Sequence, residues 1–172
     1  RQDRRLAGTG APPVEDGAAT PADEAPGDAA PILLAEDHPV NRSLVLRVLA
    51  KLGLRADVAE DGAVAVELAS RKAYRVILMD CQMPRMDGLE ATLRIRSAER
   101  TAAGRAQTPI IALTAGAMPE ERRRCLDAGM QDFLAKPLVP AELIAALRRW
   151  MPRDPDVAAS EGRNAVVADL RR

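Results

Sequence analysis

The feature that most constrains the fold is an alternation of short apolar runs with helix-length amphipathic stretches between Pro31 and Met151. Convincing apolar runs, each bounded by polar or turn residues, occupy Ile32–Ala35, Val76–Met79, Pro109–Leu113 and Asp132–Ala135, and a weaker one occupies Arg55–Ala59. Their apolarity is continuous rather than alternating, as in strands that are covered on both faces. The runs therefore predict a parallel sheet buried between helices.

Helix patterns fill the stretches between these runs. Residues 40–52 place their leucines and valines on one helical stripe, and Gly53 follows where a helix end favours a left-handed residue. Further helices are expected at residues 61–68, 88–98, 119–128 and 140–150. Five repeats of strand and helix predict an α/β fold, a flavodoxin-like doubly wound sheet of five parallel strands in the order 2-1-3-4-5.

Composition sets the limits of this domain. Residues 1–30 are rich in Ala, Pro, Gly, Asp and Glu, which predicts a disordered linker, and residues 152–172 read as a flexible tail, so the domain spans 31–151. The net charge of +0 argues against nucleic-acid binding, and the sequence has no apolar run long enough to span a membrane. We expect a monomeric, cytoplasmic segment of a longer protein, without membrane contact of its own; a membrane anchor elsewhere in the parent is left open.

Polar side chains stand at the carboxyl ends of the predicted strands, where doubly wound sheets bind ligands. Glu36 and Asp37 follow the first strand, Asp80 the third, Thr114 the fourth and Lys136 the fifth. Three converging carboxylates favour a hard divalent cation, for which Mg²⁺ is the best candidate. The lysine and the hydroxyl add donors for tetrahedral oxygens, so the set predicts phosphoryl transfer onto a carboxylate nucleophile.

Each of these residues also has an ordinary explanation. An aspartate at a strand end is usually a turn or helix-cap residue, an acidic pair is usually solvated loop surface, and Thr114 could simply cap a helix. A coincidence at four strand ends is improbable, which favours a functional site.

The same residues resemble the receiver domains of two-component response regulators and hybrid sensor histidine kinases. The resemblance covers residues 31–151 and is carried by four segments, ILLAEDHPVN, VILMDCQMPRMDG, PIIALTA and DFLAKPL. Their wording is most similar to the receiver of a hybrid sensor histidine kinase. The implied parent is a histidine kinase, and the implied partners are the dimerisation and phosphotransfer helices of such a kinase, or a histidine phosphotransfer domain.

The resemblance implies a role for each matched residue. Asp80 would be the phosphoacceptor, and Mg²⁺ would be held by Glu36, Asp37, Asp80 and the backbone carbonyl of Gln82. Thr114 and Lys136 would contact the phosphoryl group. A further set would have switch or structural roles: Thr114 and Phe133 as the switch pair, Pro137 in a commonly cis bond after the lysine, and Gly88 in the turn into the third helix.

The leading function is therefore a module that takes a phosphoryl group from a phosphohistidine onto Asp80 and then switches conformation or passes it on. Such a domain catalyses its own modification and is not a turnover enzyme. Two alternatives remain, a phosphorylation-independent docking domain and an aspartyl-phosphate phosphatase. The phosphatase is disfavoured because Gln82 stands where such enzymes commonly place a second aspartate.

Four other features receive simpler interpretations. His38 precedes a proline in a loop and is not expected to carry phosphate. Cys81 should point to the side of the strand opposite Asp80, which favours a core-filling role over redox control. Residues 97–108 are expected to form a loop, and residues 120–124 the solvated face of a helix.

Overall fold

The protein forms one α/β domain in a computed structural model that describes residues 30–102, 106–116 and 118–151. The five strands are β1 Ile32–Ala35, β2 Ala56–Ala59, β3 Ile77–Asp80, β4 Ile110–Thr114 and β5 Asp132–Ala135. The five helices are α1 Pro39–Lys51, α2 Gly62–Arg71, α3 Gly88–Thr101, α4 Pro119–Ala128 and α5 Pro140–Trp150. All strand pairs are parallel, in the order β2-β1-β3-β4-β5, which confirms the predicted fold.

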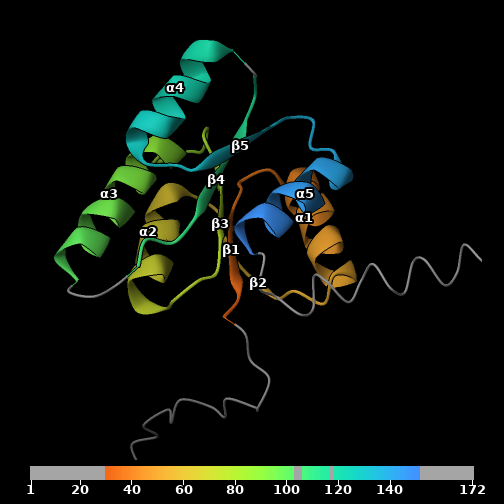
Figure 1. Ribbon diagram of the computed structural model, residues 1–172, viewed down its shortest axis with the longest axis horizontal. Helices are drawn as coiled ribbons and strands as arrows, with labels where there is room; N and C mark the ends of the chain where they lie inside the picture. The colour runs from red at the N-terminus through yellow and green to blue at the C-terminus, as the bar shows by residue number, and fades with distance from the viewer. Residues whose placement is uncertain (1–29, 103–105, 117, 152–172) are drawn as a thin grey trace, which may run out of the picture.

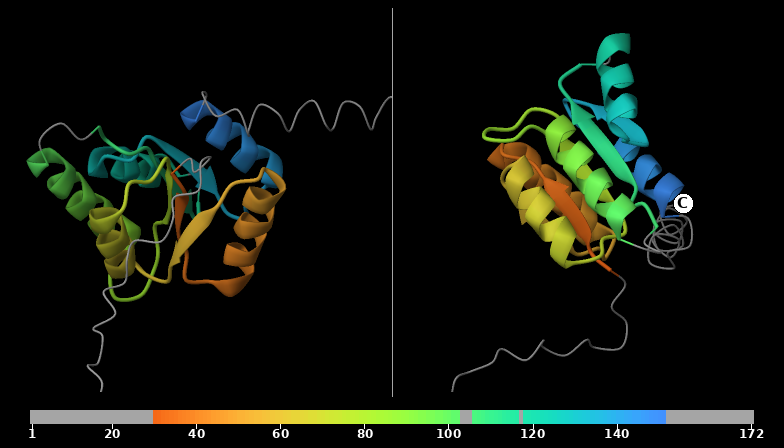
Figure 2. Two further views of the ribbon diagram at one scale, coloured as in Figure 1. Left: turned by 90° about the horizontal axis from the view of Figure 1, so that it is seen from below. Right: turned by 90° about the vertical axis from the view of Figure 1, so that its left-hand side faces the viewer.

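Two helical layers cover the sheet. Helices α1 and α5 lie on one face and α2, α3 and α4 on the other (Figures 1 and 2). Side chains alternate between the layers along each strand, so that Ile32 and Leu34 enter the core under α1 and α5, while Leu33 and Ala35 enter the other core. Burial on both faces explains the continuous apolarity of the strands in the sequence.

The helix ends follow local chemistry. The Asp61 and Asp87 carboxylates accept hydrogen bonds from the Val64 and Glu90 amides, both at 2.8 Å, and so cap α2 and α3. Gly129 ends α4 with φ +101°, a left-handed conformation that glycine adopts readily. The two aspartates thus fix where α2 and α3 begin, and Gly129 fixes where α4 ends before β5.

Helix α3 departs from the sequence-based expectation. We expected a loop from residue 97, but the helix continues to Thr101. Arg96 and Glu99 are buried and joined at 2.6 Å, and the Arg96 guanidinium also donates to the Gly129 carbonyl and to Gln131. This buried network holds the last turn of α3 against the α4–β5 connection.

The predicted linker and tail, apart from Ala30, lie outside the described residues. Within the described part of the chain, no helix has the length and apolarity needed to cross a membrane.

Candidate functional site

The carboxyl edge of the sheet brings the predicted site residues together. Lys136 reaches back from the end of β5, and its Nζ lies 2.6 Å from Asp80 Oδ2 and 3.0 Å from Glu36 Oε2. Asp80 is 2% exposed and Glu36 is fully buried. One ammonium group therefore stands between two buried carboxylates, 56 and 100 positions away in the chain.

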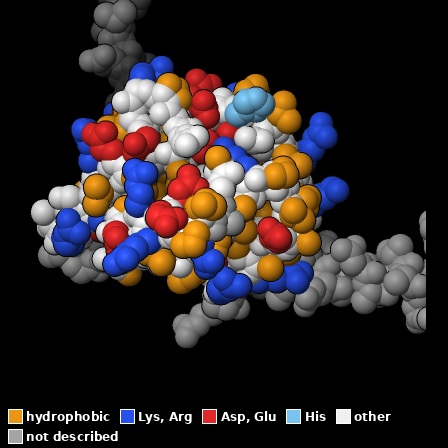
Figure 3. Space-filling model, turned by 90° about the horizontal axis from the view of Figure 1, so that it is seen from above, with side chains coloured by type: hydrophobic (Ala, Val, Ile, Leu, Met, Phe, Trp, Pro, Cys, Tyr) orange, Lys and Arg blue, Asp and Glu red, His pale blue; other side chains and the backbone are white. Residues whose placement is uncertain are grey.

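Asp37 completes an acidic cluster at the mouth of this site. Its side chain is exposed, and its carboxylate oxygen lies with oxygens of Glu36 and Asp80 in a group whose members are all within 4.8 Å of one another. Seen from above the sheet edge, acidic side chains gather beside the histidine, with basic atoms among them (Figure 3). His38 itself is exposed and is the N-cap residue of α1, where its side chain makes no capping hydrogen bond.

Burial and the neighbouring charges shift the pKa values of Asp80 and Lys136. Burial, and secondarily the charge of Glu36, raises the pKa of Asp80 against the opposing effects of Lys136 and the Gln82 amide. The two carboxylates raise the pKa of Lys136, although burial opposes this. The lysine therefore stays protonated, and it is the cation that faces the Asp80 and Glu36 carboxylates.

The donor set fits a hard divalent cation. Glu36 Oε2 is buried and has no hydrogen-bond partner among the described residues; its one near charge is the Lys136 ammonium, an ion-pair partner at 3.0 Å. Glu36 Oε1 is satisfied by the His38 amide and the Asn41 side chain, both at 3.2 Å. A buried carboxylate oxygen that accepts no hydrogen bond, beside two further carboxylates, is suited to Mg²⁺, directly or through a water.

The loop between β3 and α3 is held at both ends. At the start of the loop, the Gln82 amide donates to Asp80 Oδ1 at 3.0 Å. At its end, a Cβ on Gly88 would lie 2.1 Å from the Asp80 carbonyl oxygen, so only glycine allows the chain to pass this close to the end of β3. Arg85, at φ +66°, pairs with the buried Asp61 carboxylate at the start of α2. This clamp fixes the loop that carries Gln82.

Neither predicted switch residue hydrogen-bonds to a carboxylate of the acidic cluster in the part of the chain that the structure describes. Thr114 is buried at the end of β4, and its hydroxyl donates to the Gly116 carbonyl rather than to Asp80. Phe133 is half-buried in β5 beneath the Arg122 guanidinium, whose carbon lies 4.0 Å from the ring centroid. Arg122 is exposed, as expected for the solvated face of this helix, and in addition it packs on the Phe133 ring. The Lys136–Pro137 peptide bond is cis.

Sequence reasoning missed three polar partners. Asn41 contacts Glu36, Arg85 pairs with Asp61, and Arg96 ties α3 to the α4–β5 turn. Asp61 followed by Gly62 signalled only a helix start in the sequence, and nothing in the chain indicated that Arg85 would reach it.

A cavity of about 540 Å³ adjoins the acidic cluster, between the β3–α3 loop and α4. Its lining includes Asp37, Gln82 and Thr114 as well as both cysteines, Cys81 and Cys125. Cys81 packs against the core on the α2–α4 side, as expected.

Comparisons with known proteins agree with this geometry. The family model of the response regulator receiver domain matches residues 32–148. Histidine protein kinase 1 of Candida albicans is 44% identical over 118 residues, which cover 65% of this chain. The chain spans only a small part of the curated relatives it matches, 5% in the Candida protein.

Solved structures show the same fold. The receiver domain of the sensor histidine kinase PA1611 from Pseudomonas aeruginosa, with magnesium coordinated in its active-site cleft, is 45% identical with a TM-score of 0.63, covering 72% of this chain and 98% of that one. The Saccharomyces cerevisiae receiver of Ssk1, crystallised with the histidine phosphotransfer protein Ypd1, is 28% identical with a TM-score of 0.67, covering 70% and 88% of the two chains.

Proposed function

Because the chain belongs to the response regulator receiver domain family, we propose that it accepts a phosphoryl group from a phosphohistidine onto the Asp80 carboxylate. The observation that carries this proposal is the Lys136 ammonium 2.6 Å from Asp80 Oδ2, inside a cluster of three carboxylates. Asp80 is the member of that cluster at the end of the central strand β3.

The chemistry requires no general base. A carboxylate oxygen of Asp80 attacks phosphorus, an O–P bond forms, and the P–N bond to the donor imidazole breaks with the electron pair leaving on nitrogen. The Lys136 ammonium, which already donates to Asp80, would then donate to a phosphoryl oxygen and stabilise its negative charge. The Gln82 amide holds Asp80 Oδ1, which orients the carboxylate for attack.

Glu36, Asp37, Asp80 and the backbone carbonyl of Gln82 would hold Mg²⁺ in this proposal. When bound, the ion supplies positive charge that offsets both carboxylate repulsion and the charge of the arriving phosphoryl oxygens. The magnesium in the cleft of the PA1611 receiver supports the assignment.

The switch follows from the added charge. A phosphoryl group brings roughly two negative charges and three acceptor oxygens, which compete with the Gly116 carbonyl for the Thr114 hydroxyl. Rotation of Thr114 toward Asp80 would free space near β4 for Phe133, which lies at the neighbouring strand. The surface formed by α4, β5 and α5 would change with it.

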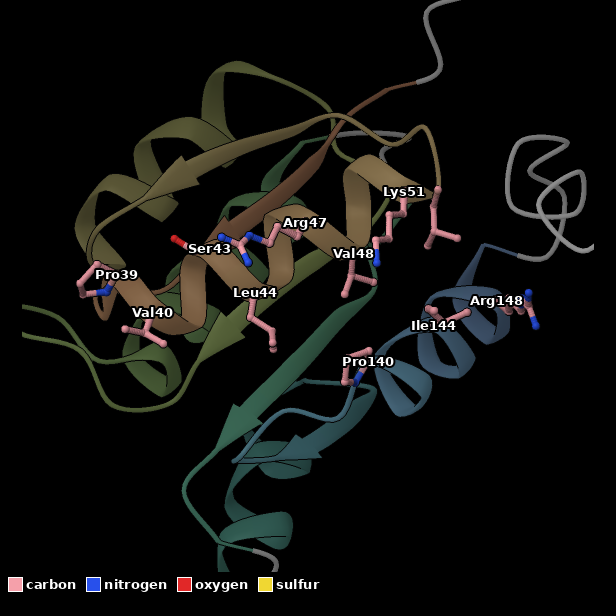
Figure 4. A pocket seen from close by; sticks show the side chains of 11 residues that line it. Pro39, Val40, Ser43, Leu44, Arg47, Val48, Lys51, Pro140, Ile144 and Arg148 are labelled. Carbon is pink, nitrogen blue, oxygen red and sulfur yellow. The ribbon is translucent and has the colours of Figure 1, made fainter. Parts of the chain in front are cut away.

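The phosphodonor is proposed to dock in an apolar groove between α1 and α5. The groove has a volume of about 700 Å³ and is lined by Val40, Leu44 and Ile144, with Arg47 and Lys51 along α1 (Figure 4). It starts at Pro39, the first residue of α1 and two positions after Asp37, so a helix lying in it could carry its phosphohistidine to the site. The Ypd1 complex of the Ssk1 receiver supports a helical phosphotransfer partner.

A single substitution separates docking from chemistry. Val40 is 68% exposed, and Val40→Asp should slow phosphorylation by a protein phosphohistidine donor at least about tenfold while leaving phosphorylation by phosphoramidate unchanged. The matched control is Leu93→Asp on α3, where the side chain is 53% exposed on the other layer and neither rate should change. An equal loss with both donors would contradict a docking role for the groove.

The proposed function itself is tested by intact-mass analysis after incubation with phosphoramidate and Mg²⁺. The wild-type chain should gain one phosphoryl group, and excess EDTA should prevent the gain without unfolding the domain. The absence of any adduct in the folded wild type with Mg²⁺ would favour the alternative of a phosphorylation-independent docking domain.

A further inference from the structure

Two thiols meet directly beside the phosphoacceptor. Cys81 follows Asp80 at the end of β3, and Cys125 lies on the inner face of α4, 44 positions later. Their Sγ atoms are 3.5 Å apart, and both cysteines are free. The sequence alone gave no reason to pair them, because nothing in their spacing indicates that the inner face of α4 returns to this strand.

Small molecules can reach this pair. Both cysteines line the 540 Å³ cavity beside the acidic cluster, whose walls also include the exposed residues Gln82 and Asp87. Cys81 is half-buried, whereas Cys125 is only 3% exposed. An oxidant entering the cavity therefore meets Cys81 as the more accessible thiol, with the second thiol behind it.

We propose that Cys81 and Cys125 are a redox modification site, at which a peroxide forms a reversible disulfide that ties α4 to the acceptor strand. The chemistry has two steps. Peroxide transfers one oxygen to the Cys81 thiol, giving a sulfenic acid and one water, and the Cys125 thiol then displaces that oxygen as a second water while the S–S bond forms. Two thiols are oxidised and one peroxide is reduced to two waters.

The geometry favours this outcome over further oxidation of one sulfur. Disulfide sulfurs lie about 2.05 Å apart, so the two Sγ atoms, now 3.5 Å apart, need to approach by about 1.5 Å. A resolving thiol already in contact captures the sulfenic acid before a second peroxide arrives. Burial raises the pKa of the Cys81 thiol, so the first step is slow, because the thiolate is the form that reacts with peroxide.

The crosslink would act on the element that the switch uses. Cys81 is bound into the sheet, its amide donating to the Leu113 carbonyl at 3.0 Å, and its carbonyl accepts from the Gly88 amide at 3.2 Å. A disulfide would thus fix α4 to a rigid strand end one residue from Asp80. This consequence rests on the proposed function: the oxidised domain should accept a phosphoryl group yet fail to rearrange α4.

The crosslink is tested without reference to phosphorylation. The full chain is incubated with hydrogen peroxide, denatured, alkylated and analysed by mass spectrometry. We expect a product lighter by two hydrogen atoms, with a peptide pair joined at Cys81 and Cys125 and full reversal by dithiothreitol. Cys81→Ala and Cys125→Ala are the matched controls, and neither should yield the internal crosslink.

Two results would overturn the proposal: a sulfinic or sulfonic acid accumulating on Cys81 in place of the crosslink, or crosslinks only between separate chains. Amide hydrogen exchange supplies a second readout, since exchange across residues 121–128 should slow in the oxidised form only. Unchanged exchange there would contradict the claim that the disulfide restrains α4.

The effect on the switch is read from amide chemical shifts with and without beryllofluoride, an aspartyl-phosphate mimic. The α4 shift changes should appear in the reduced form and be lost in the oxidised form. Chemical-shift changes in α4 of the same size in the reduced and oxidised forms would contradict the claim that the disulfide prevents α4 from rearranging. A crosslink that forms in a domain that neither binds beryllofluoride nor takes up phosphate would leave the redox site standing and instead contradict the proposed function.

Discussion

Replacing Lys136 with methionine leaves the buried Asp80 and Glu36 carboxylates without the ammonium group that contacts both of them. Removing one member of a buried ion pair typically costs about 3 to 5 kcal/mol, because the remaining charge is desolvated without compensation. The Lys136 side chain is 20% exposed, and water at the mouth of the site lowers the cost. We therefore expect Lys136→Met to lower the free energy of unfolding by about 2 to 4 kcal/mol at pH 7.

Proton uptake sets an upper bound on this loss. In the variant, one proton bound to Asp80 neutralises the carboxylate charge that Lys136 balances in the wild type. The free energy needed to bind that proton is set by how far the pH lies above the ordinary aspartate pKa of 3.8. At pH 7 that distance is about 3.2 units, or about 4 kcal/mol, and at pH 5 it is about 1.2 units, or about 1.6 kcal/mol. Burial and Glu36 raise the pKa of Asp80, so the folded variant binds this proton more readily than the unfolded chain. The penalty must then grow as pH rises above 3.8 and shrink as pH falls.

Urea unfolding of both proteins at pH 5 and pH 7 measures the effect. Trp150 is a suitable fluorescent probe, since it is half-buried with its indole donating to Asp132 Oδ2 at 2.9 Å. Lys72→Met is the matched control: its partner is Asp57 at 3.1 Å in an exposed pair, and it should cost less than about 1 kcal/mol at either pH. A Lys136→Met penalty equal at pH 5 and pH 7, or unchanged by added Mg²⁺, would refute the charge-compensation argument.

Three further substitutions test the surrounding structure. Arg96→Met should cost about 2 to 4 kcal/mol in urea unfolding, because it strands the buried Glu99 carboxylate, and adding Glu99→Gln should recover part of the loss. Gly88→Ala should slow phosphorylation by phosphoramidate about 10- to 100-fold in a folded domain, since the new Cβ would displace the loop from the Asp80 carbonyl; an unchanged rate would contradict this. Asp61→Asn should lower the free energy of unfolding by about 1 to 2 kcal/mol at pH 7, because the Val64 amide and then Arg85 lower the pKa of Asp61. The stability difference between wild type and variant should disappear as pH falls below 3.8 and through that lowered pKa. A stability difference that does not change with pH would exclude the charge of Asp61 as its origin.

The fold could be predicted from sequence because its pattern is local. Strands such as Ile32–Ala35 and Ile110–Thr114 are buried on both faces, so each is a continuous apolar run, and the helices between them carry one apolar stripe. The last turn of α3 escaped prediction because it depends on Arg96, whose partners Gly129 and Gln131 are more than thirty positions away.

The residues of the site could be predicted from the sequence, but their contacts could not. Parallel strands end at one edge of the sheet, so Asp37, Asp80 and Lys136 had to lie near one another once the strands were identified. Contacts made by side-chain packing across the chain were not predictable. The position of Lys136 between two carboxylates, and the meeting of Cys81 with Cys125, follow only from the packed structure.

The central claim, that Asp80 carries the phosphoryl group, is tested most directly by locating the acyl phosphate. Treatment of the phosphorylated chain with borohydride reduces an aspartyl phosphate to homoserine, and peptide sequencing by tandem mass spectrometry then reads its position. We predict homoserine at Asp80 alone in the wild type, dependent on phosphodonor and Mg²⁺, and none in Asp80→Asn. Homoserine at Asp37 or another carboxylate in the wild type, or the same yield of phosphoryl adduct in Asp80→Asn, would contradict the account.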